Sequence, residues 1–207
     1  MDLKDVRLFK NTEIDIDKIE IREYPSNYTI EIEGDTSLYL GIVLEGRVFV
    51  RAYSLAGKEF IISTIDPGMV FGDVLLFGTK SNIYPGNLIT SGKTVLAILP
   101  NDQVRHLIQT SPNFSTNYLS LLSDKVYSIN HKSKLLSQDS VRDKILFYLH
   151  QEMRQQQTNK IQLNMSKEEL ANNLFMQRPS LSRELIKMRD EGILDFDRWT
   201  ITLKQRR

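Results

Sequence analysis

The chain has 207 residues, a hydrophobic fraction of 41% and a formal net charge of +1, as expected for a globular protein with one large domain or two modest ones. It has no cysteine, which excludes disulfides, thiolate metal sites and iron–sulfur clusters. Because it also lacks an apolar run of membrane-spanning length and a signal-peptide pattern, we expect a cytoplasmic protein that does not enter the membrane.

Short strands are predicted between residues 19 and 99. The stretch YTIEIEGD alternates apolar and polar residues and breaks at Gly34, and LYLGIVLEGRVFVRAY forms two strands joined by a tight turn at Gly46. KEFIISTIDPGMVFGD adds a strand and then a turn at Pro67. Short, closely spaced strands with glycine and proline between them predict a small antiparallel barrel or jelly roll.

A long helix is predicted next, because the residues from Pro112 to Gln138 include no glycine and no further proline. Along it, residues recur at alternating steps of three and four, in the series Leu119, Leu122, Val126, Ile129, Ser133 and Leu136. This heptad spacing is broken only by the serine and makes a narrow stripe. The pattern favours a homodimer interface between two such helices. The alternative is one amphipathic helix that packs on its own barrel.

Residues 139–207 show a succession of helix, strand, two helices and hairpin. A helix is expected over SVRDKILFYLHQEM, a short strand over IQLNM, and a helix over SKEELANNL, which opens with a capping box between Ser166 and Glu169. A tight turn leads to a second helix at 178–191, which Gly192 closes, and two short strands follow. This is the winged helix-turn-helix pattern, in which the second helix enters the major groove of DNA.

The second helix has two different faces. Leu181, Leu185 and Met188 fall together and are expected to face the core. On the other side, an arginine can donate two hydrogen bonds to guanine, a serine can bond a base edge or a phosphate, and a lysine can neutralise a phosphate. The candidate DNA-binding residues are Arg178, Pro179, Ser180, Ser182, Arg183 and Lys187 of this helix, Ser166 of the preceding helix, and Arg198 and Thr200 of the wing. The alternative is an ordinary helical hairpin with solvated arginines.

Over nearly its whole length the chain resembles the Crp/Fnr family of bacterial transcription regulators. LYLGIVLEGRVFVRAYSLAGKEFIISTIDPGMVFGDVLLF resembles the family's β-roll, and LANNLFMQRPSLSRELIKMRDEGIL resembles its helix-turn-helix. The resemblance implies an α+β fold in three parts. These are an N-terminal antiparallel β-roll (double-stranded β-helix or jelly roll) as a cyclic-nucleotide-binding-like sensor domain at 1–112, a dimerisation helix at 113–138, and a C-terminal winged helix-turn-helix at 139–207.

The same resemblance implies a function that is not enzymatic. It implies a homodimeric transcription regulator that binds double-stranded DNA at a near-palindromic operator, reads it with helix 178–191, and contacts RNA polymerase. A small effector bound in the β-roll is the family-like signal. An effector-independent regulator of the same fold is the alternative.

Departures from the cyclic-AMP-binding members argue against that nucleotide as the effector. Asp73 stands where those members have a glutamate for the ribose, and Ile83-Tyr84 where they have an arginine-serine pair for the phosphate. Without the arginine, a buried cyclic phosphate loses its main countercharge. Ile129-Asn130 replaces the pair that meets adenine. The candidate effector pocket is Asp73, Lys80, Asn82, Tyr84, Asn87, Tyr118 and Asn130, and the alternative is a filled, dry barrel.

Two departures concern the helix-turn-helix. Many members have a glutamate after the first arginine, where it accepts from cytosine, whereas Pro179 cannot hydrogen-bond a base. Phe175 stands where a turn glycine often lies. Because a bulky residue is unfavourable at positive φ, the turn is expected to differ locally.

The sequence argues against two other classes of protein. A cupin-type metalloenzyme needs histidine and carboxylate ligands on its barrel strands, and residues 19–99 contain no histidine. Haem binding is not expected either, because His106, His131 and His150 lie on predicted helices. A module whose C-terminal helices bind protein would lack the steep salt dependence of DNA binding. We therefore expect no catalytic residues, no metal and no cofactor.

Overall fold

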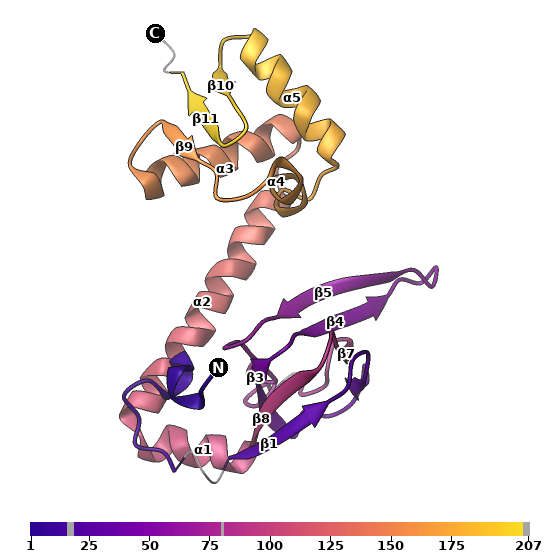
Figure 1. Cartoon of the computed structure of the whole chain (residues 1–207), viewed down its shortest axis with the longest axis vertical. Coiled ribbons are helices and arrows are strands. Elements are labelled where there is room, and N and C mark those ends of the chain that lie inside the picture. Colours follow the sequence, from indigo (N-terminus) through magenta and orange to yellow (C-terminus); the bar gives the residue numbers. More distant parts are fainter. Residues whose placement is uncertain (16–18, 80, 205–207) are drawn as a thin grey trace. The chain divides into compact units, whose positions relative to one another are not determined.

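The computed structural model describes residues 1–15, 19–79 and 81–204 (Figure 1). The chain divides into two compact units, an N-terminal unit at 1–125 and a C-terminal unit at 126–207. The division falls inside the long helix α2 (Pro112–Leu136), so each unit includes part of that helix. The domain boundaries expected at 112 and 138 stay a prediction.

Two four-stranded antiparallel sheets build the roll of the N-terminal unit, with strand orders β1-β8-β3-β6 and β2-β7-β4-β5 (Figure 1). The strands are β1 (Glu20–Tyr24), β2 (Thr29–Glu31), β3 (Tyr39–Glu45), β4 (Val48–Tyr53), β5 (Glu59–Ile65), β6 (Val70–Phe71), β7 (Asn87–Thr90) and β8 (Thr94–Pro100). Gly46 makes the tight turn between β3 and β4 with φ 78°. A Cβ there would lie 2.3 Å from the carbonyl oxygen of Lys93, so only glycine fits.

The roll is filled with side chains. Residues from both sheets share one core cluster, which consists of Val43, Val48, Val50, Ile65, Phe71, Tyr84, Leu88, Leu96 and Ile98. A second cluster joins Leu40 and Ile42 of β3 to the short N-terminal helices η1 (Leu3–Asp5) and η2 (Arg7–Phe9) and to the start of α2. The helix α1 (Asn101–Thr110) supplies Val104 to this second cluster. The alternation along β3 and β8 sends residues of the same strand into both clusters, so these two strands are buried on both faces of their sheet.

The first turns of α2 belong to the core of the N-terminal unit. Phe114 and Tyr118 are buried, and their rings lie 6.2 Å apart between centroids. The amide of Asn117 donates to the carbonyl oxygens of Leu8 and Lys10 at 3.2 and 2.8 Å. These bonds tie the N-terminal segment to α2.

The C-terminal unit packs three helices against a small sheet (Figure 1). Its elements are α3 (Val141–Gln156), β9 (Lys160–Gln162), α4 (Lys167–Asn173), α5 (Arg178–Asp190), β10 (Leu194–Phe196) and β11 (Thr200–Leu203). The sheet is antiparallel with the order β10-β11-β9. Ile145 and Leu149 of α3, Leu170 of α4, and Leu185 of α5 meet in one buried cluster. The predicted α+β fold, with its roll, long helix and winged helix-turn-helix, is confirmed.

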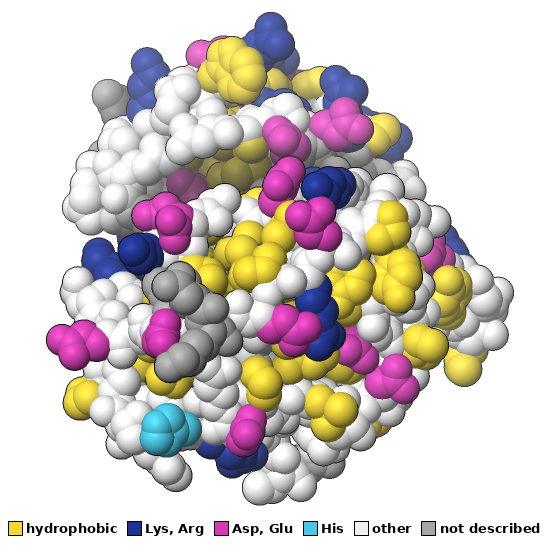
Figure 2. Space-filling view, turned by 60° about the horizontal axis from the view of Figure 1, so that its bottom comes forward, with side chains coloured by type: hydrophobic (Ala, Val, Ile, Leu, Met, Phe, Trp, Pro, Cys, Tyr) yellow, Lys and Arg dark blue, Asp and Glu magenta, His cyan; other side chains and the backbone are white. Residues whose placement is uncertain are grey.

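The surface carries charges of both signs. On the face shown in Figure 2, basic and acidic side chains are interspersed and apolar side chains lie between them. No single sign of charge covers that face, which is consistent with the net charge of +1. Within the described ranges, no helix combines the length and apolar character that crossing a bilayer requires.

Candidate nucleic-acid interface

Helix α5 is defined at both ends by local chemistry. Gln177 is its N-cap, and Pro179 lies in the first turn, where its missing N–H would have had no helical partner. At the other end Gly192 takes φ 73° and its N–H donates to the carbonyl oxygen of Arg189 at 2.9 Å. This left-handed glycine stops the helix and turns the chain toward β10.

The two faces of α5 are those that its sequence predicts. Leu181, Leu185 and Met188 are at most 1% exposed. Ser180 is half-buried at the edge of the opposite face, and five other candidate residues are exposed: Arg178, Pro179, Ser182, Arg183 and Lys187. Neither Arg178 nor Arg183 has a hydrogen-bond or ion-pair partner among the described residues. Both guanidinium groups are therefore free to donate to an incoming acceptor.

The turn before α5 holds a phenylalanine in the left-handed conformation. Phe175 has φ 53°, and the residue is 47% exposed. Its N–H donates to the carbonyl oxygen of Asn172 at 3.0 Å, and that of Met176 donates to Ala171 at 3.0 Å. Contrary to expectation, the bulky residue has not displaced the turn from positive φ. The turn is kept at the cost of local backbone strain.

Helix α4 begins with the predicted capping box, which is confirmed. The N–H of Glu169 donates to Oγ of Ser166 at 3.2 Å, and Oε2 of Glu169 accepts from the N–H of Ser166 at 2.7 Å. The second bond lowers the pKa of Glu169 below its ordinary value. Ser166 is exposed, and its side chain also contributes to the lowered pKa of Glu169.

The wing turn is organised by Asp197. Its carboxylate accepts from the backbone N–H groups of Trp199 and Thr200, both at 2.7 Å, and from the Thr200 hydroxyl at 2.8 Å. The hydroxyl bond is the main reason that the pKa of Asp197 lies below its ordinary value. The Thr200 proton is therefore committed to Asp197. Arg198 is exposed and its guanidinium lies 5.0 Å from the ring centroid of Trp199.

Two basic residues of this unit were missed by the sequence analysis. Lys167, the first residue of α4, places its Nζ 5.5 Å from the ring centroid of Phe196, with no hydrogen-bond acceptor in the described part of the chain. Desolvation lowers the pKa of Lys167. Arg142 of α3 forms ion pairs with Glu184 and Glu191. The capping box could have drawn attention to the neighbouring Lys167, whereas no local pattern predicts the partners of Arg142.

The predicted dimer stripe is largely exposed on α2. Leu119, Val126, Ile129 and Leu136 are between 54% and 63% exposed, and Ser133 is also exposed. Leu122 differs, because it is half-buried against the core of the N-terminal unit. A shallow groove on the last turns is lined by Ile129, Lys132, Ser133, Leu136 and Ser137.

The candidate effector residues have separate environments. Asp73 is 2% exposed, Nζ of Lys125 lies 2.7 Å from both of its carboxylate oxygens, and the Tyr118 hydroxyl donates to its carbonyl oxygen at 2.6 Å. Tyr84 lies in the roll core, where burial raises its pKa to about 12 and its hydroxyl lies 3.3 Å from Oγ of Ser37.

The other candidate effector residues form no side-chain hydrogen bond with Asp73 or Tyr84 among the described residues. Asn87 accepts from the N–H of Glu33 at 2.8 Å. Asn82 is exposed on the roll, and Asn130 is exposed in the C-terminal unit. Lys80 lies outside the described residues. The sequence analysis did not anticipate Lys125, which occupies the Asp73 carboxylate.

Comparison with known proteins now identifies the family. Residues 21–111 match the description of a cyclic nucleotide-binding domain, and residues 144–207 match that of a Crp-like helix-turn-helix domain. The chain belongs to the Crp/Fnr family. Transcription regulators make up this family, and the resemblance seen in the sequence is confirmed.

A curated relative of this Crp/Fnr chain is distant in sequence. A CRP-like cAMP-activated global transcriptional regulator of Mycobacterium tuberculosis is 23% identical over 109 residues, which are 53% of this chain and 48% of that protein. The match thus spans about half the length of the curated relative.

Solved structures share the fold at similarly low identity. The Thermus thermophilus catabolite activator protein is 23% identical, with a TM-score of 0.56 over 96% of this chain and 93% of that one. A CooA mutant from Carboxydothermus hydrogenoformans is 20% identical, with a TM-score of 0.58 over 95% and 88%. The c-di-GMP responsive regulator CLP of Xanthomonas campestris is 24% identical, with a TM-score of 0.53 over 92% and 96%.

Proposed function

We propose that this protein is a homodimeric, sequence-specific DNA-binding transcription regulator that reads a near-palindromic operator with α5. One observation carries the proposal: α5 buries one face completely and exposes unpartnered arginines on the other, within a winged helix-turn-helix unit. Free guanidinium groups on a helix of this fold can donate to guanine in the major groove. As in the rest of the family, the protein would work in the cytoplasm and contact RNA polymerase.

The residues of the interface have different roles in this proposal. Arg183, on the exposed face, reads a base, and Arg178 at the tip of α5 reads a base or holds a phosphate. Lys187 and Arg198 bind phosphates and position the protein without reading sequence. Pro179 offers only an apolar contact, such as a thymine methyl group. The operator should therefore differ from one that is read by a glutamate at this position.

The exposed stripe on α2 supports a homodimer. An apolar row of this length on one helix is costly in water, and pairing two copies would bury it. A two-fold dimer would also supply two copies of α5 for two half-sites about one helical turn of DNA apart.

The contacts of Asp73 and Tyr84 favour a regulator that works without a nucleotide effector. The Asp73 carboxylate already has a cation, Lys125, and Tyr84 fills the roll core. A nucleotide bound at these residues would have to break the ion pair between Asp73 and Lys125 and displace the Tyr84 side chain from the core. This favours the effector-independent alternative over a ligand in the roll.

Selection of bound sequences from random DNA tests the proposed function. We expect enrichment of a two-fold-symmetric site, with binding that weakens steeply between roughly 50 and 200 mM salt because several phosphates are neutralised. If no symmetric sequence were enriched at low salt, with or without cell extract to supply a signal, the proposed function would be wrong.

A further inference from the structure

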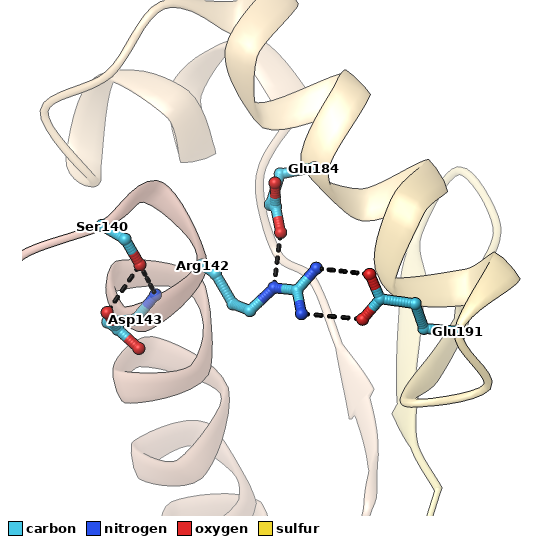
Figure 3. A network of polar contacts seen from close by, with 5 residues as sticks. All are labelled: Ser140, Arg142, Asp143, Glu184 and Glu191. Atoms are coloured by element: carbon cyan, nitrogen blue, oxygen red, sulfur yellow. Dashed lines mark hydrogen bonds and ion pairs between the residues drawn. The ribbon is translucent and has the colours of Figure 1, made fainter.

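Arg142 joins two helices of the C-terminal unit through three hydrogen bonds. Its Nε donates to Oε1 of Glu184 at 2.6 Å, and its Nη1 and Nη2 donate to the two carboxylate oxygens of Glu191 at 2.7 and 2.9 Å. Figure 3 shows the guanidinium reaching from α3 to Glu184 of α5 and to Glu191, the C-cap of that helix. A planar guanidinium held in this two-pronged way has a defined orientation as well as a defined position.

The first turn of α3, which carries Arg142, is itself held in place by a cap. Ser140 caps α3: its Oγ accepts from the N–H of Asp143 at 3.0 Å, and its hydroxyl donates to the Asp143 carboxylate at 2.6 Å (Figure 3). Arg142 lies in the first turn that this cap holds, so its backbone has little freedom. The side chains of Arg142 and Glu184 are 29% and 19% exposed, so solvent reaches them only in part.

The two glutamates are placed to control the rotation of α5. They are seven residues apart, so they return to the same side of the helix within about 20° and lie roughly 10 Å apart along its axis. The apolar face of α5 packs on the core, but apolar contacts have no direction. Directional hydrogen bonds at two points along one side resist rotation of the helix about its axis.

A small rotation would matter for reading a base. Arg183 precedes Glu184 and projects about 100° around the helix from it. A rotation of about 20° moves a group roughly 6 Å from the axis by about 2 Å, which is enough to break a bidentate hydrogen bond.

We propose that Arg142 is a positioning residue for sequence recognition, which acts through Glu184 and Glu191 to hold α5 at the rotation that base reading requires. The inference rests on the proposed function and adds a residue that does not touch DNA. Its consequence is that Arg142 controls the discrimination between operator and random DNA more than the affinity for DNA in general.

The decisive variants change charge in opposite directions. Arg142→Gln removes a positive charge, whereas the double variant Glu184→Gln, Glu191→Gln removes two negative charges. If these groups acted only through long-range electrostatics, the first would weaken binding to every DNA and the second would strengthen it. If they position α5, both should reduce the ratio of operator to random affinity, by about tenfold or more.

Controls separate positioning from folding. Arg154→Gln removes an exposed positive charge from the last turn of the same helix and should leave the ratio unchanged. Arg142→Lys keeps the charge but loses the two-pronged geometry, so it should leave the affinity for random DNA unchanged and still lower the ratio of operator to random affinity. Far-ultraviolet circular dichroism and melting curves identify any variant that fails to fold, and Glu191→Gln alone, which keeps the Glu184 bond, is the milder replacement.

A measurement without DNA keeps the two proposals apart. Amide hydrogen exchange should quicken along α5 in Arg142→Gln while α4 keeps its protection. If exchange along α5 and the affinity ratio both stayed at wild-type values in folded Arg142→Gln, the positioning role would be overturned. A wild-type protein that selects no DNA would overturn the proposed function, and the exchange experiment would still decide whether Arg142 restrains α5.

Discussion

The backbone angle of Phe175 is costly for any residue with a Cβ, by about 1–2 kcal/mol. We expect Phe175→Gly to be more stable than Phe175→Ala by about 1 kcal/mol, because both lose the ring but only glycine adopts positive φ without strain. Urea unfolding measures the difference. The matched pair Ile186→Gly and Ile186→Ala, at an exposed helical position, should show the reverse order. The same order at both positions would contradict the strain.

Arg183 tests base reading at the level of one side chain. Arg183→Ala should weaken binding to the selected operator by roughly 1–3 kcal/mol and relax the preference at one base position. Repeating the selection and measuring affinity for both operator and random DNA would show this. An equal loss on the two DNAs would instead assign Arg183 to a phosphate.

The contact between α2 and the roll includes an ion pair in which the carboxylate of Asp73 is nearly buried. Asp73 is 2% exposed, and only one of its carboxylate oxygens takes a well-aligned hydrogen bond from Lys125 within the described residues. Lys125→Met should cost about 2–3 kcal/mol of stability, less than the roughly 3–5 kcal/mol for a fully buried pair, because the lysine is one-third exposed.

The double variant completes this test. Adding Asp73→Asn to Lys125→Met removes the stranded charge, so the double variant should be more stable than Lys125→Met alone. Urea unfolding of the four proteins gives the coupling. If the second substitution only added to the first loss, the pair would not be coupled.

Substitutions in the exposed stripe of α2 test the proposed homodimer. Val126→Glu or Ile129→Lys should convert a dimer into a monomer, because a charge at the centre of an apolar interface is desolvated without a partner. Sedimentation at matched concentrations measures this. Ser128→Glu lies on another side of the same helix and should remain dimeric. A dimer that survives both stripe variants would place the interface elsewhere.

For the whole molecule, carboxylates link stability to pH. The pKa values of Glu169 and Asp197 are lowered in the folded chain by hydrogen bonds that their charged forms accept. A lowered folded pKa stabilises the protein above the unfolded pKa, and this contribution is lost as pH falls through the folded value. The difference in urea midpoint between wild type and Glu169→Gln, Asp197→Asn should therefore be present at pH 7 and shrink as the pH falls below the ordinary pKa of a carboxyl group, roughly 4. A difference that persists in acid would contradict this linkage.

The predictable part of the molecule is the part that local patterns encode. The 3.6-residue period identified the buried face of α5 through Leu181 and Leu185, and the capping box of α4 needs only residues three apart. The pair Asp73–Lys125 and the pair Arg142–Glu191 join residues 52 and 49 positions apart. Such pairs depend on how elements pack, which no local period reports.

Tyr84 shows the same limit within the roll. Its phenol suits a pocket wall or a core equally, because the ring is apolar and the hydroxyl needs only one partner. The structure places it in the core with Ser37 as that partner, so a residue expected to line an effector pocket fills the interior instead.

Trp199 is the only tryptophan of the chain, and it lies in the wing turn with 45% of its surface exposed. Its indole can be excited apart from the eight tyrosines, and it lies beside Arg198, one of the residues proposed to bind phosphate. Because the emission of an indole responds to the water around it, covering the wing changes the signal of the whole protein. The chain thus carries its own optical reporter for docking of the wing, without any added label.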